Sequence, residues 1–288
     1  QPLGLPPMTV LEFSLLVALG GLLAGFLGAL TGLGGGVVIV PLLTGLFKVD
    51  IHYAIGASLV SVIATSSGAA AAYVREGYSN VRVGMVLEIA TTVGALTGAY
   101  VGSAIPPDYL AVVFGVVLLV SAYLSTRARS DEETGGAPDP IAGRLRLDAS
   151  YPTPRGRTHY HVRRVPLGFL LMYVAGVISG LLGIGSGAFK VLAMDRAMRL
   201  PFKVSTTTSN FMIGVTAAAS AGVYLGHNYI RPTVAMPVML GVLAGSLLGT
   251  RVLVVARVKV LRLVFGAVIV ALAVQMIYNG VTGGFSHE

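Results

Sequence analysis

Two short glycine-rich strings have the residue types and spacing best suited to binding a ligand. They are GLGGG at Gly32–Gly36 and GIGSG at Gly183–Gly187, and each precedes a short apolar run. A glycine-rich break that opens a helix exposes backbone N–H groups without intrahelical partners and directs the positive end of the helix dipole at the gap. Both effects favour an anion. We therefore predict an anion site at the backbone of Gly34, Gly35, Gly36, Gly185, Ser186 and Gly187; the alternative is that these residues only permit a turn or close helix packing.

A second polar cluster follows each short run, and its hydroxyl and amide groups carry no fixed charge. Such groups suit an oxyanion that must lose its water and later be released. The candidate side chains are Ser58 in the first cluster and Ser209 and Asn210 in the second. Ser and Thr in membrane helices also bond to carbonyls or join neighbouring helices, so we expect the remaining hydroxyls to be structural.

Lys190 falls inside the second short apolar run, and Glu88 falls inside a long one. A lysine at bilayer depth costs roughly 2.5–3.5 kcal/mol on insertion scales and needs a partner or a substrate. We predict that Lys190 faces the anion, with snorkelling to an interface as the alternative. Glu88 begins less than two turns after Arg82, so we predict that it snorkels rather than coupling protons. No histidine spacing fits a metal ion, and we predict no metal site and no cofactor.

The composition is typical of a membrane protein. Of 288 residues, 55% are hydrophobic and 11% are charged, whereas soluble domains have about 25% charged residues. The mean hydropathy is +0.81. Apolar runs near the roughly 20 residues that cross a bilayer recur along the chain, which excludes a large soluble enzyme domain. The chain has no Cys, which excludes disulfides and thiolate metal sites, and we attribute the net charge of +8 to membrane topology rather than to nucleic-acid binding.

The chain is predicted to be an internal duplication. The second glycine string follows the first at an offset of 151 residues (183 minus 32), and the same offset pairs Ser58 with Ser209 and Thr65 with Thr216 without a gap. Each half contains five apolar runs. They are 10–31, 34–47, 53–74, 82–104 and 108–126 in the first half and 166–182, 187–199, 204–226, 232–250 and 259–279 in the second.

The distribution of Lys and Arg favours five crossings in each half. If the short runs cross, 17 basic residues fall on one side and 2 on the other; if they are re-entrant, the split is 11 against 8. By the positive-inside rule the linker is then cytoplasmic and both termini lie outside. An odd number of crossings makes the halves an inverted repeat, as in secondary transporters. The expected fold is an all-α polytopic membrane protein of two five-segment inverted repeats, about ten membrane segments, with one short Gly-preceded helix per half.

The expected organisation follows from these boundaries. Residues 1–7 are expected to be a processing or expression remnant, 8–126 the first repeat, 127–165 a charged cytoplasmic linker, 166–280 the second repeat and 281–288 a C-terminal tail. Two glycine ladders, Gly94, Gly98 and Gly102 in the first half and Gly241, Gly245 and Gly249 in the second, are expected to be helix-packing faces.

In combination these strings resemble the sulfite exporter TauE/SafE family of prokaryotic membrane transporters. The resemblance is carried by GALTGLGGGVVIVPLL with AIGASLVSV, and by GLLGIGSGAFKVLAMD with STTTSNFMIG, and it covers about residues 10–126 and 166–280. It implies transport of sulfite, sulfoacetate or related organosulfonates, mostly outward. Alternatives are an anion channel and an uptake permease for the same substrates.

The expected location is the plasma membrane of a prokaryote. The expected partners are a small anionic substrate and the lipid bilayer, with no nucleic acid. The sequence is compatible with a homodimer. A cytoplasm-negative potential favours outward movement of an anion by about 2.3 kcal/mol per charge per 100 mV, whereas uptake needs a coupled ion.

Overall fold

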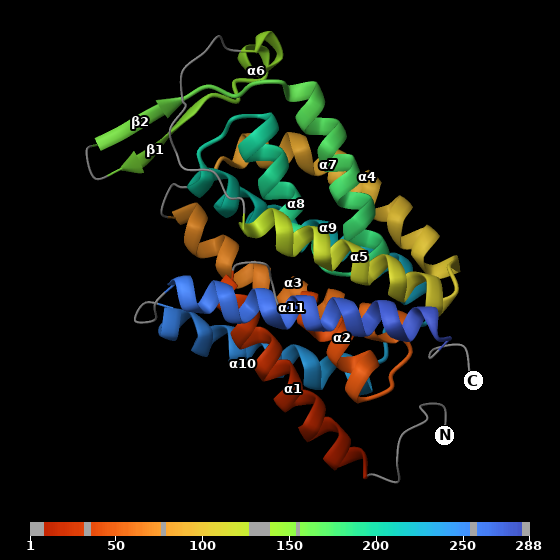
Figure 1. Ribbon diagram of the computed structural model, residues 1–288. Helices are drawn as coiled ribbons and strands as arrows, with labels where there is room; N and C mark the ends of the chain where they lie inside the picture. The colour runs from red at the N-terminus through yellow and green to blue at the C-terminus, as the bar shows by residue number, and fades with distance from the viewer. Residues whose placement is uncertain are drawn as a thin grey trace.

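The protein is an assembly of packed helices with one small hairpin. The computed structural model describes residues 9–31, 36–75, 79–126, 139–153, 156–253 and 258–283. Its elements are α1 (Val10–Thr31), α2 (Gly36–Leu46), α3 (Ile51–Arg75), α4 (Val81–Ala104), α5 (Pro107–Thr126), α6 (Pro140–Arg144), β1 (Ala149–Thr153), β2 (Gly156–Tyr160), α7 (Val165–Leu182), α8 (Gly187–Leu192), the π-helix η1 (Ala193–Ala197), α9 (Phe202–Gly226), α10 (Pro232–Leu253) and α11 (Val258–Val281) (Figure 1). Each predicted apolar run coincides with a helix, except that 187–199 covers α8 and η1.

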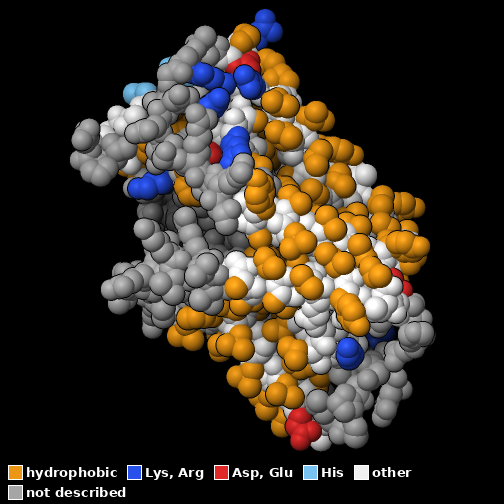
Figure 2. Space-filling model, in the orientation of Figure 1, with side chains coloured by type: hydrophobic (Ala, Val, Ile, Leu, Met, Phe, Trp, Pro, Cys, Tyr) orange, Lys and Arg blue, Asp and Glu red, His pale blue; other side chains and the backbone are white. Residues whose placement is uncertain are grey.

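The described helices include three that are long and apolar enough to cross a membrane. They are Val81–Ala104, Val165–Leu182 and Pro232–Gly249. Five further helices contribute apolar stretches of 10–17 residues within the described part of the chain, which are Leu11–Leu27, Gly36–Leu46, Ile51–Ser66, Pro107–Tyr123 and Gly266–Val281. Large hydrophobic side chains are exposed along their outer faces, as at Ile89, Val93 and Leu96 on α4. Figure 2 shows hydrophobic side chains over a broad area of the face in view, with several Lys and Arg gathered at the end that carries the hairpin. This apolar surface suits contact with lipid acyl chains.

Helix α4 packs against α7, and α1 packs against α10, with the two helices of each pair running in the same direction and their backbones in close contact. On α4, a Cβ at Gly94 would lie 2.2 Å from the carbonyl oxygen of Tyr173, and one at Gly98 would lie 2.0 Å from that of Val177 on α7. On α10, a Cβ at Gly245 would lie 2.0 Å from the carbonyl oxygen of Leu22 on α1. Residue numbers rise together in both members of the α4–α7 pair, so these helices run in the same direction. Close backbone contact at Gly94, Gly98, Gly102, Gly241 and Gly245 confirms the packing role of the ladders.

Two other pairs pack antiparallel. Gly56 on α3 approaches the carbonyl oxygen of Tyr229 just after α9, whereas Ser66, further along α3, approaches Gly214 in the middle of α9. On α5, Asp108 approaches Gly280 of α11, and Gly115 approaches Ala273. Figure 1 shows α5 and α11 side by side and running in opposite directions.

Part of the predicted linker is folded onto the bundle. Strands β1 and β2 form an antiparallel hairpin, and Leu147 and Tyr160 are buried in a core shared with α4, α7 and α9. The Asn80 side chain caps α4 by accepting from the Val83 N–H, and its amide donates to the Leu147 carbonyl oxygen (2.8 Å) and the Tyr160 hydroxyl (2.9 Å). Burial raises the pKa of Tyr160 to about 12. The sequence did not predict this hairpin; residues 1–7, 127–138 and 284–288 of the predicted segments lie outside the described residues.

Candidate functional site

The second glycine string forms a tight break between two helices. Helix α7 ends with Gly183 in a left-handed conformation (φ 67°), whose N–H donates to the Ser179 carbonyl oxygen. Gly185 (φ 70°) and Ser186 (φ 44°) are also left-handed, and α8 begins at the next residue. Glycine adopts this conformation without the steric cost that other residues incur, which explains its use at 183 and 185. The chain therefore changes direction within a few residues in the interior of the bundle.

The first residue of α2 lies against the second predicted break. A Cβ at Gly36, the first residue of α2, would lie 2.7 Å from Ser58 Oγ and 3.1 Å from the carbonyl oxygen of Gly183. Ser58 Oγ donates to that same carbonyl oxygen at 2.8 Å. The start of α2 and the end of α7 are thus joined through α3. Gly34 and Gly35, which were predicted to share the site, lie outside the described residues.

Helices α3 and α9 enclose the second break from opposite halves of the chain. A Cβ at Gly185 would lie 3.3 Å from Val62 on α3 and 3.0 Å from Ile213 on α9. Ser209 Oγ donates to the carbonyl oxygen of Gly187 at 3.4 Å. Asn210 follows Ser209 and is half-buried, and it points about 100° further round α9. The structure thus brings together Gly36, Ser58, Gly185, Ser186, Gly187 and Ser209.

The hydroxyl protons at these breaks differ in availability. Ser58 gives its proton to the Gly183 carbonyl oxygen, so in this conformation the proton is not free for an anion. Ser186 Oγ and Ser179 Oγ are buried and have no hydrogen-bond partner within the described residues. Buried hydroxyls are normally paired, so these two groups have unused capacity to bind a ligand or water. Ser179 was not predicted as a site residue, and its burial beside the break is what identifies it.

Lys190 lies one turn beyond the break and is completely buried, so it does not snorkel. The backbone N–H of Lys190 donates to the Ser186 carbonyl oxygen at 3.1 Å. Its side-chain Nζ donates to Thr216 Oγ1 on α9. Thr216 Oγ1 is also 2.7 Å from Glu88 Oε1 on α4. The prediction that Glu88 snorkels is therefore wrong: its side chain points inward because Thr216 and Thr92 offer hydrogen bonds there. One feature of the sequence could have indicated that the two charges belong together: both have apolar counterparts in the other repeat, Met239 for Glu88 and Ile39 for Lys190.

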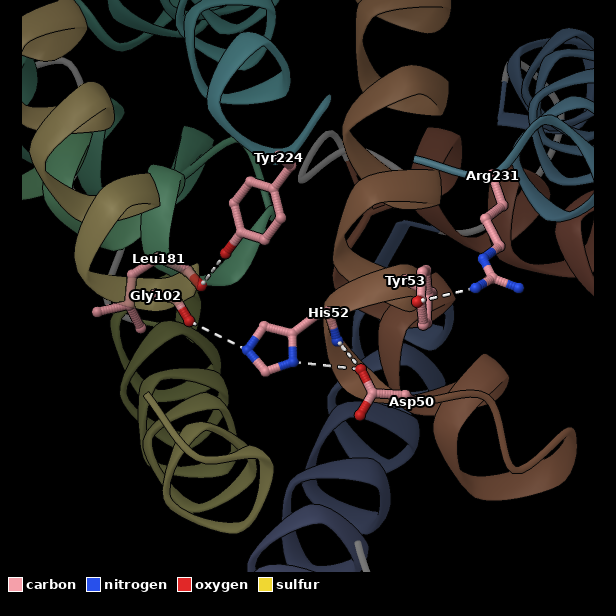
Figure 3. Close-up of polar contacts among 7 residues, drawn as sticks. All are labelled: Asp50, His52, Tyr53, Gly102, Leu181, Tyr224 and Arg231. Carbon is pink, nitrogen blue, oxygen red and sulfur yellow. Dashed lines mark hydrogen bonds and ion pairs between the residues drawn. The ribbon is translucent and has the colours of Figure 1, made fainter. Parts of the chain in front are cut away.

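A separate polar network lies at the far end of α4 from the hairpin (Figure 3). His52 Nδ1 lies 3.2 Å from Asp50 Oδ1, and His52 Nε2 lies 3.2 Å from the Gly102 carbonyl oxygen. The His52 ring therefore bridges Asp50 and the C-terminal end of α4. The Tyr224 hydroxyl donates to the Leu181 carbonyl oxygen next to Gly102. This network ties the start of α3 to the ends of α4, α7 and α9.

Asp50 is expected to make the fold sensitive to acid. Burial raises the pKa of its carboxyl, but hydrogen bonds from His52 outweigh this effect and hold the pKa below its usual value. A pKa lower in the folded state means that the ionised carboxylate stabilises the fold above about pH 4, and that this contribution is lost as the pH falls through the folded pKa. Asp50→Asn should lower the free energy of unfolding by about 1 kcal/mol at neutral pH, allowing for partial exposure. Thermal unfolding followed by circular dichroism should show this deficit shrinking in acid; an equal deficit at both pH values would contradict the assignment.

The described residues contain no group of three His, Cys, Asp or Glu side chains placed to hold a metal ion. Within the predicted linker, His161 Nδ1 contacts Asp148 Oδ2 at 2.8 Å on the surface. The glycine-rich breaks present backbone N–H groups, hydroxyls and a buried ammonium. Such groups bind an anion rather than a metal ion.

Comparison with known proteins gives a consistent match over most of the chain. The family model described as Sulfite exporter TauE/SafE matches residues 17–276. YunE of Bacillus subtilis (strain 168), a probable membrane transporter protein, is 29% identical over 94% of this chain and 99% of its own length. A probable membrane transporter protein of Xylella fastidiosa (strain Temecula1 / ATCC 700964) is 28% identical over 94% of this chain and 97% of its own. ORF9 of Sinorhizobium sp, also a probable membrane transporter protein, is 22% identical over 88% of each. No solved structure gives a significant match.

Proposed function

This chain belongs to the sulfite exporter TauE/SafE family, and from that premise we propose that it is a secondary transporter that exports a small sulfur-containing oxyanion by alternating access. The substrate class is sulfite, sulfoacetate or a related organosulfonate. The observation that carries the proposal is the position of Gly36, at the start of α2, beside Gly183 in the second glycine-rich break, with the buried Lys190 one turn beyond that break. Secondary transporters bind their substrates at such interrupted helices near mid-depth.

The arrangement of helix pairs supports two inverted repeats. At the offset of 151 residues, Gly94 corresponds to Gly245 and Tyr173 corresponds to Leu22. The structure contains both contacts, Gly94 with Tyr173 and Gly245 with Leu22, so each half makes the same contact with the other. Reciprocal contacts are the mark of a twofold axis. The equivalent helices α3 and α9 run antiparallel, as do α5 and α11, whereas repeats pointing the same way would make them parallel. The axis therefore lies in the membrane plane.

We infer that the hairpin lies on the cytoplasmic side. Figure 1 shows the hairpin at one end of the bundle, and α1 begins and α11 ends towards the other. The 17 basic residues assigned to the hairpin side, against 2 on the opposite side, favour this orientation by the positive-inside rule. The named relatives are bacterial, which supports location in a prokaryotic plasma membrane.

The anion is held by groups that differ in role. The N–H groups at Gly34, Gly35 and Gly36, the hydroxyl of Ser186 and the ammonium of Lys190 neutralise its charge, with Gly185, Gly187 and Asn210 around them. Ser58 and Ser209 hold the breaks in position through the Gly183 and Gly187 carbonyl oxygens. Release of these two bonds on substrate binding would free both hydroxyls to donate to the anion.

Ser186→Ala tests the site because it separates binding from stability. Removal of one hydrogen bond to a charged ligand corresponds to a loss of about 1.5–3 kcal/mol, or roughly a tenfold to hundredfold decrease in sulfite flux from proteoliposomes. The variant should unfold at no lower temperature than the wild type, because an unpartnered buried hydroxyl is lost. Ser79→Ala removes another buried unpartnered hydroxyl, outside the breaks, and should leave flux unchanged.

Transport kinetics distinguish the carrier from its alternatives. Counterflow, in which unlabelled sulfite on one side drives labelled sulfite from the other, requires a carrier, whereas a channel gives none. Flux of sulfite that shows no counterflow, or that is the same in Ser186→Ala and wild type, would contradict the proposal. Vesicles of defined sidedness then separate export from uptake.

A further inference from the structure

The cluster of Glu88, Thr216 and Lys190 has an unfilled position for a proton. Lys190 is completely buried and Glu88 is 8% exposed. Glu88 Oε1 accepts from Thr216 (2.7 Å) and Thr92 (3.3 Å), whereas its second oxygen, Oε2, is buried without a partner in the described part of the chain. A carboxylate oxygen without a donor in the interior is costly. Protonation of the carboxyl group at Oε1 removes the negative charge that Oε2 shares, and so lowers this cost.

The Thr216 hydroxyl can accommodate Glu88 with or without a proton. The hydroxyl has one proton and two lone pairs, and it accepts from Lys190 Nζ. Its proton can be directed to Glu88 Oε1 at 2.7 Å or to the Met212 carbonyl oxygen at 2.9 Å, but not to both. When Glu88 is ionised, the hydroxyl donates to it. When Glu88 is protonated, the hydroxyl can turn to Met212 and accept from the carboxyl group.

Comparison of the two halves separates the part of the Glu88–Thr216–Lys190 cluster that both halves share from the part that is specific to this cluster. At the offset of 151 residues, Thr216 corresponds to Thr65 and Met212 to Ser61. Thr65 Oγ1 donates to the Ser61 carbonyl oxygen at 3.0 Å, so the same backbone bond is present in both halves. Each charge is present in one half alone, Glu88 in the first and Lys190 in the second, because Met239 and Ile39 occupy the equivalent positions. The fold thus accepts apolar residues there, and charges buried at bilayer depth need another explanation.

We propose that Glu88 is a proton-binding site that couples protons to transport of the anion, with Lys190 as the positive charge that the carboxylate and the anion share. This inference rests on the proposed function. In the empty carrier, Glu88 balances Lys190 through Thr216. When a monoanion binds beside Lys190, Glu88 takes up a proton from the same side, so the loaded cluster also has no net charge. The anion and the proton leave together on the other side, and no covalent bond to the anion is made or broken.

This coupling changes what drives the transporter. A carrier with no net charge in either state does not respond to the membrane potential, so flux follows the combined gradients of anion and proton. Outward flux then depends on accumulation of the substrate inside, and an acidic exterior drives uptake. Without the proton, the loaded site carries a negative charge and the potential again favours export.

Few titratable groups compete with Glu88 for this role. Within the described residues, Lys190 is the charged group that acts on Glu88 electrostatically. The other titratable side chains of α4 and of the helices packed against it are Arg82, Tyr100, Tyr173 on α7, and Lys203 and Tyr224 on α9. Arg82 and Lys203 are exposed at the hairpin end, and Tyr224 belongs to the network at the opposite end.

Infrared difference spectroscopy tests the proton site without requiring transport. The wild-type protein should show the band of a protonated carboxyl that appears as the pH is lowered, and Glu88→Gln should lose it. Glu12→Gln, which changes the other glutamate that the structure describes, should keep the band. Absence of the band from the wild type, or its persistence in Glu88→Gln, would overturn the inference whether or not the protein moves sulfur anions.

Proteoliposomes test the coupling with methanesulfonate, which keeps one negative charge across the neutral range. In the wild type, an acidic exterior at zero potential should increase uptake several-fold, and an imposed potential should have little effect. Glu88→Gln should lose the response to the pH gradient and gain a response to the potential. Equal responses in the two proteins would overturn the inference while leaving anion transport intact. If the wild type moves neither methanesulfonate nor sulfite, the proposed function fails, and the infrared result alone decides the proton site.

Discussion

Replacing Glu88 by Met and Lys190 by Ile together is expected to leave the protein at least as stable as the wild type, whereas either change alone should lower the free energy of unfolding by about 3 kcal/mol. The single changes leave one buried charge without its counter-charge. The double change introduces the residues found at the equivalent repeat positions, which are Met239 of the second half for Glu88 and Ile39 of the first half for Lys190. It also keeps the Thr216 bond to the Met212 carbonyl oxygen.

Thermal unfolding in detergent, followed by circular dichroism because the chain has no Trp, gives the four corners of this double-mutant cycle. If the losses from the two single changes simply add in the double variant, the two charges do not interact and the coupling model fails. A stable double variant also provides the folded protein in which loss of the pH-gradient response is measured.

Gly98→Ala is expected to disrupt the contact between α4 and α7. A Cβ at this position would lie 2.0 Å from the carbonyl oxygen of Val177, which is backbone and has no rotamer to adopt. The helices must separate, and overpacking of this kind typically costs about 1–3 kcal/mol. Gly222→Ala is the matched control, because nothing lies within 4 Å of its added methyl group. That change should be neutral or stabilising by up to about 1 kcal/mol, because Ala favours helices.

The duplication that the sequence predicts extends this expectation to a second interface. Gly94 and Gly245 are equivalent positions, and an added Cβ would meet the carbonyl oxygens of Tyr173 and Leu22 at 2.2 and 2.0 Å. Gly94→Ala and Gly245→Ala should therefore lower the unfolding temperature by similar amounts. A large loss from one and none from the other would show that the two halves do not pack equivalently.

Most of the helices could be predicted from the sequence because their signal is local. The runs predicted at 10–31 and 82–104 differ from α1 and α4 by at most one residue at either end. Sustained hydrophobicity between polar breaks is sufficient to locate such helices. The hairpin could not be predicted in this way because its position depends on contacts with residues distant in the chain. The Asn80 side chain donates hydrogen bonds to Leu147 and Tyr160, which are 67 and 80 residues away.

The sequence by itself predicted the duplication, and it determined the glycine contact faces and the types of polar group at the breaks, because each of these is a pattern along the chain. The tertiary structure decided what each polar group bonds to. Ser58 gives its proton to a carbonyl 125 residues away, and Glu88 turns inward to a threonine 128 residues away. Hydrogen bonds require atoms within about 3 Å, and which distant helices approach that closely is set by packing of the whole bundle.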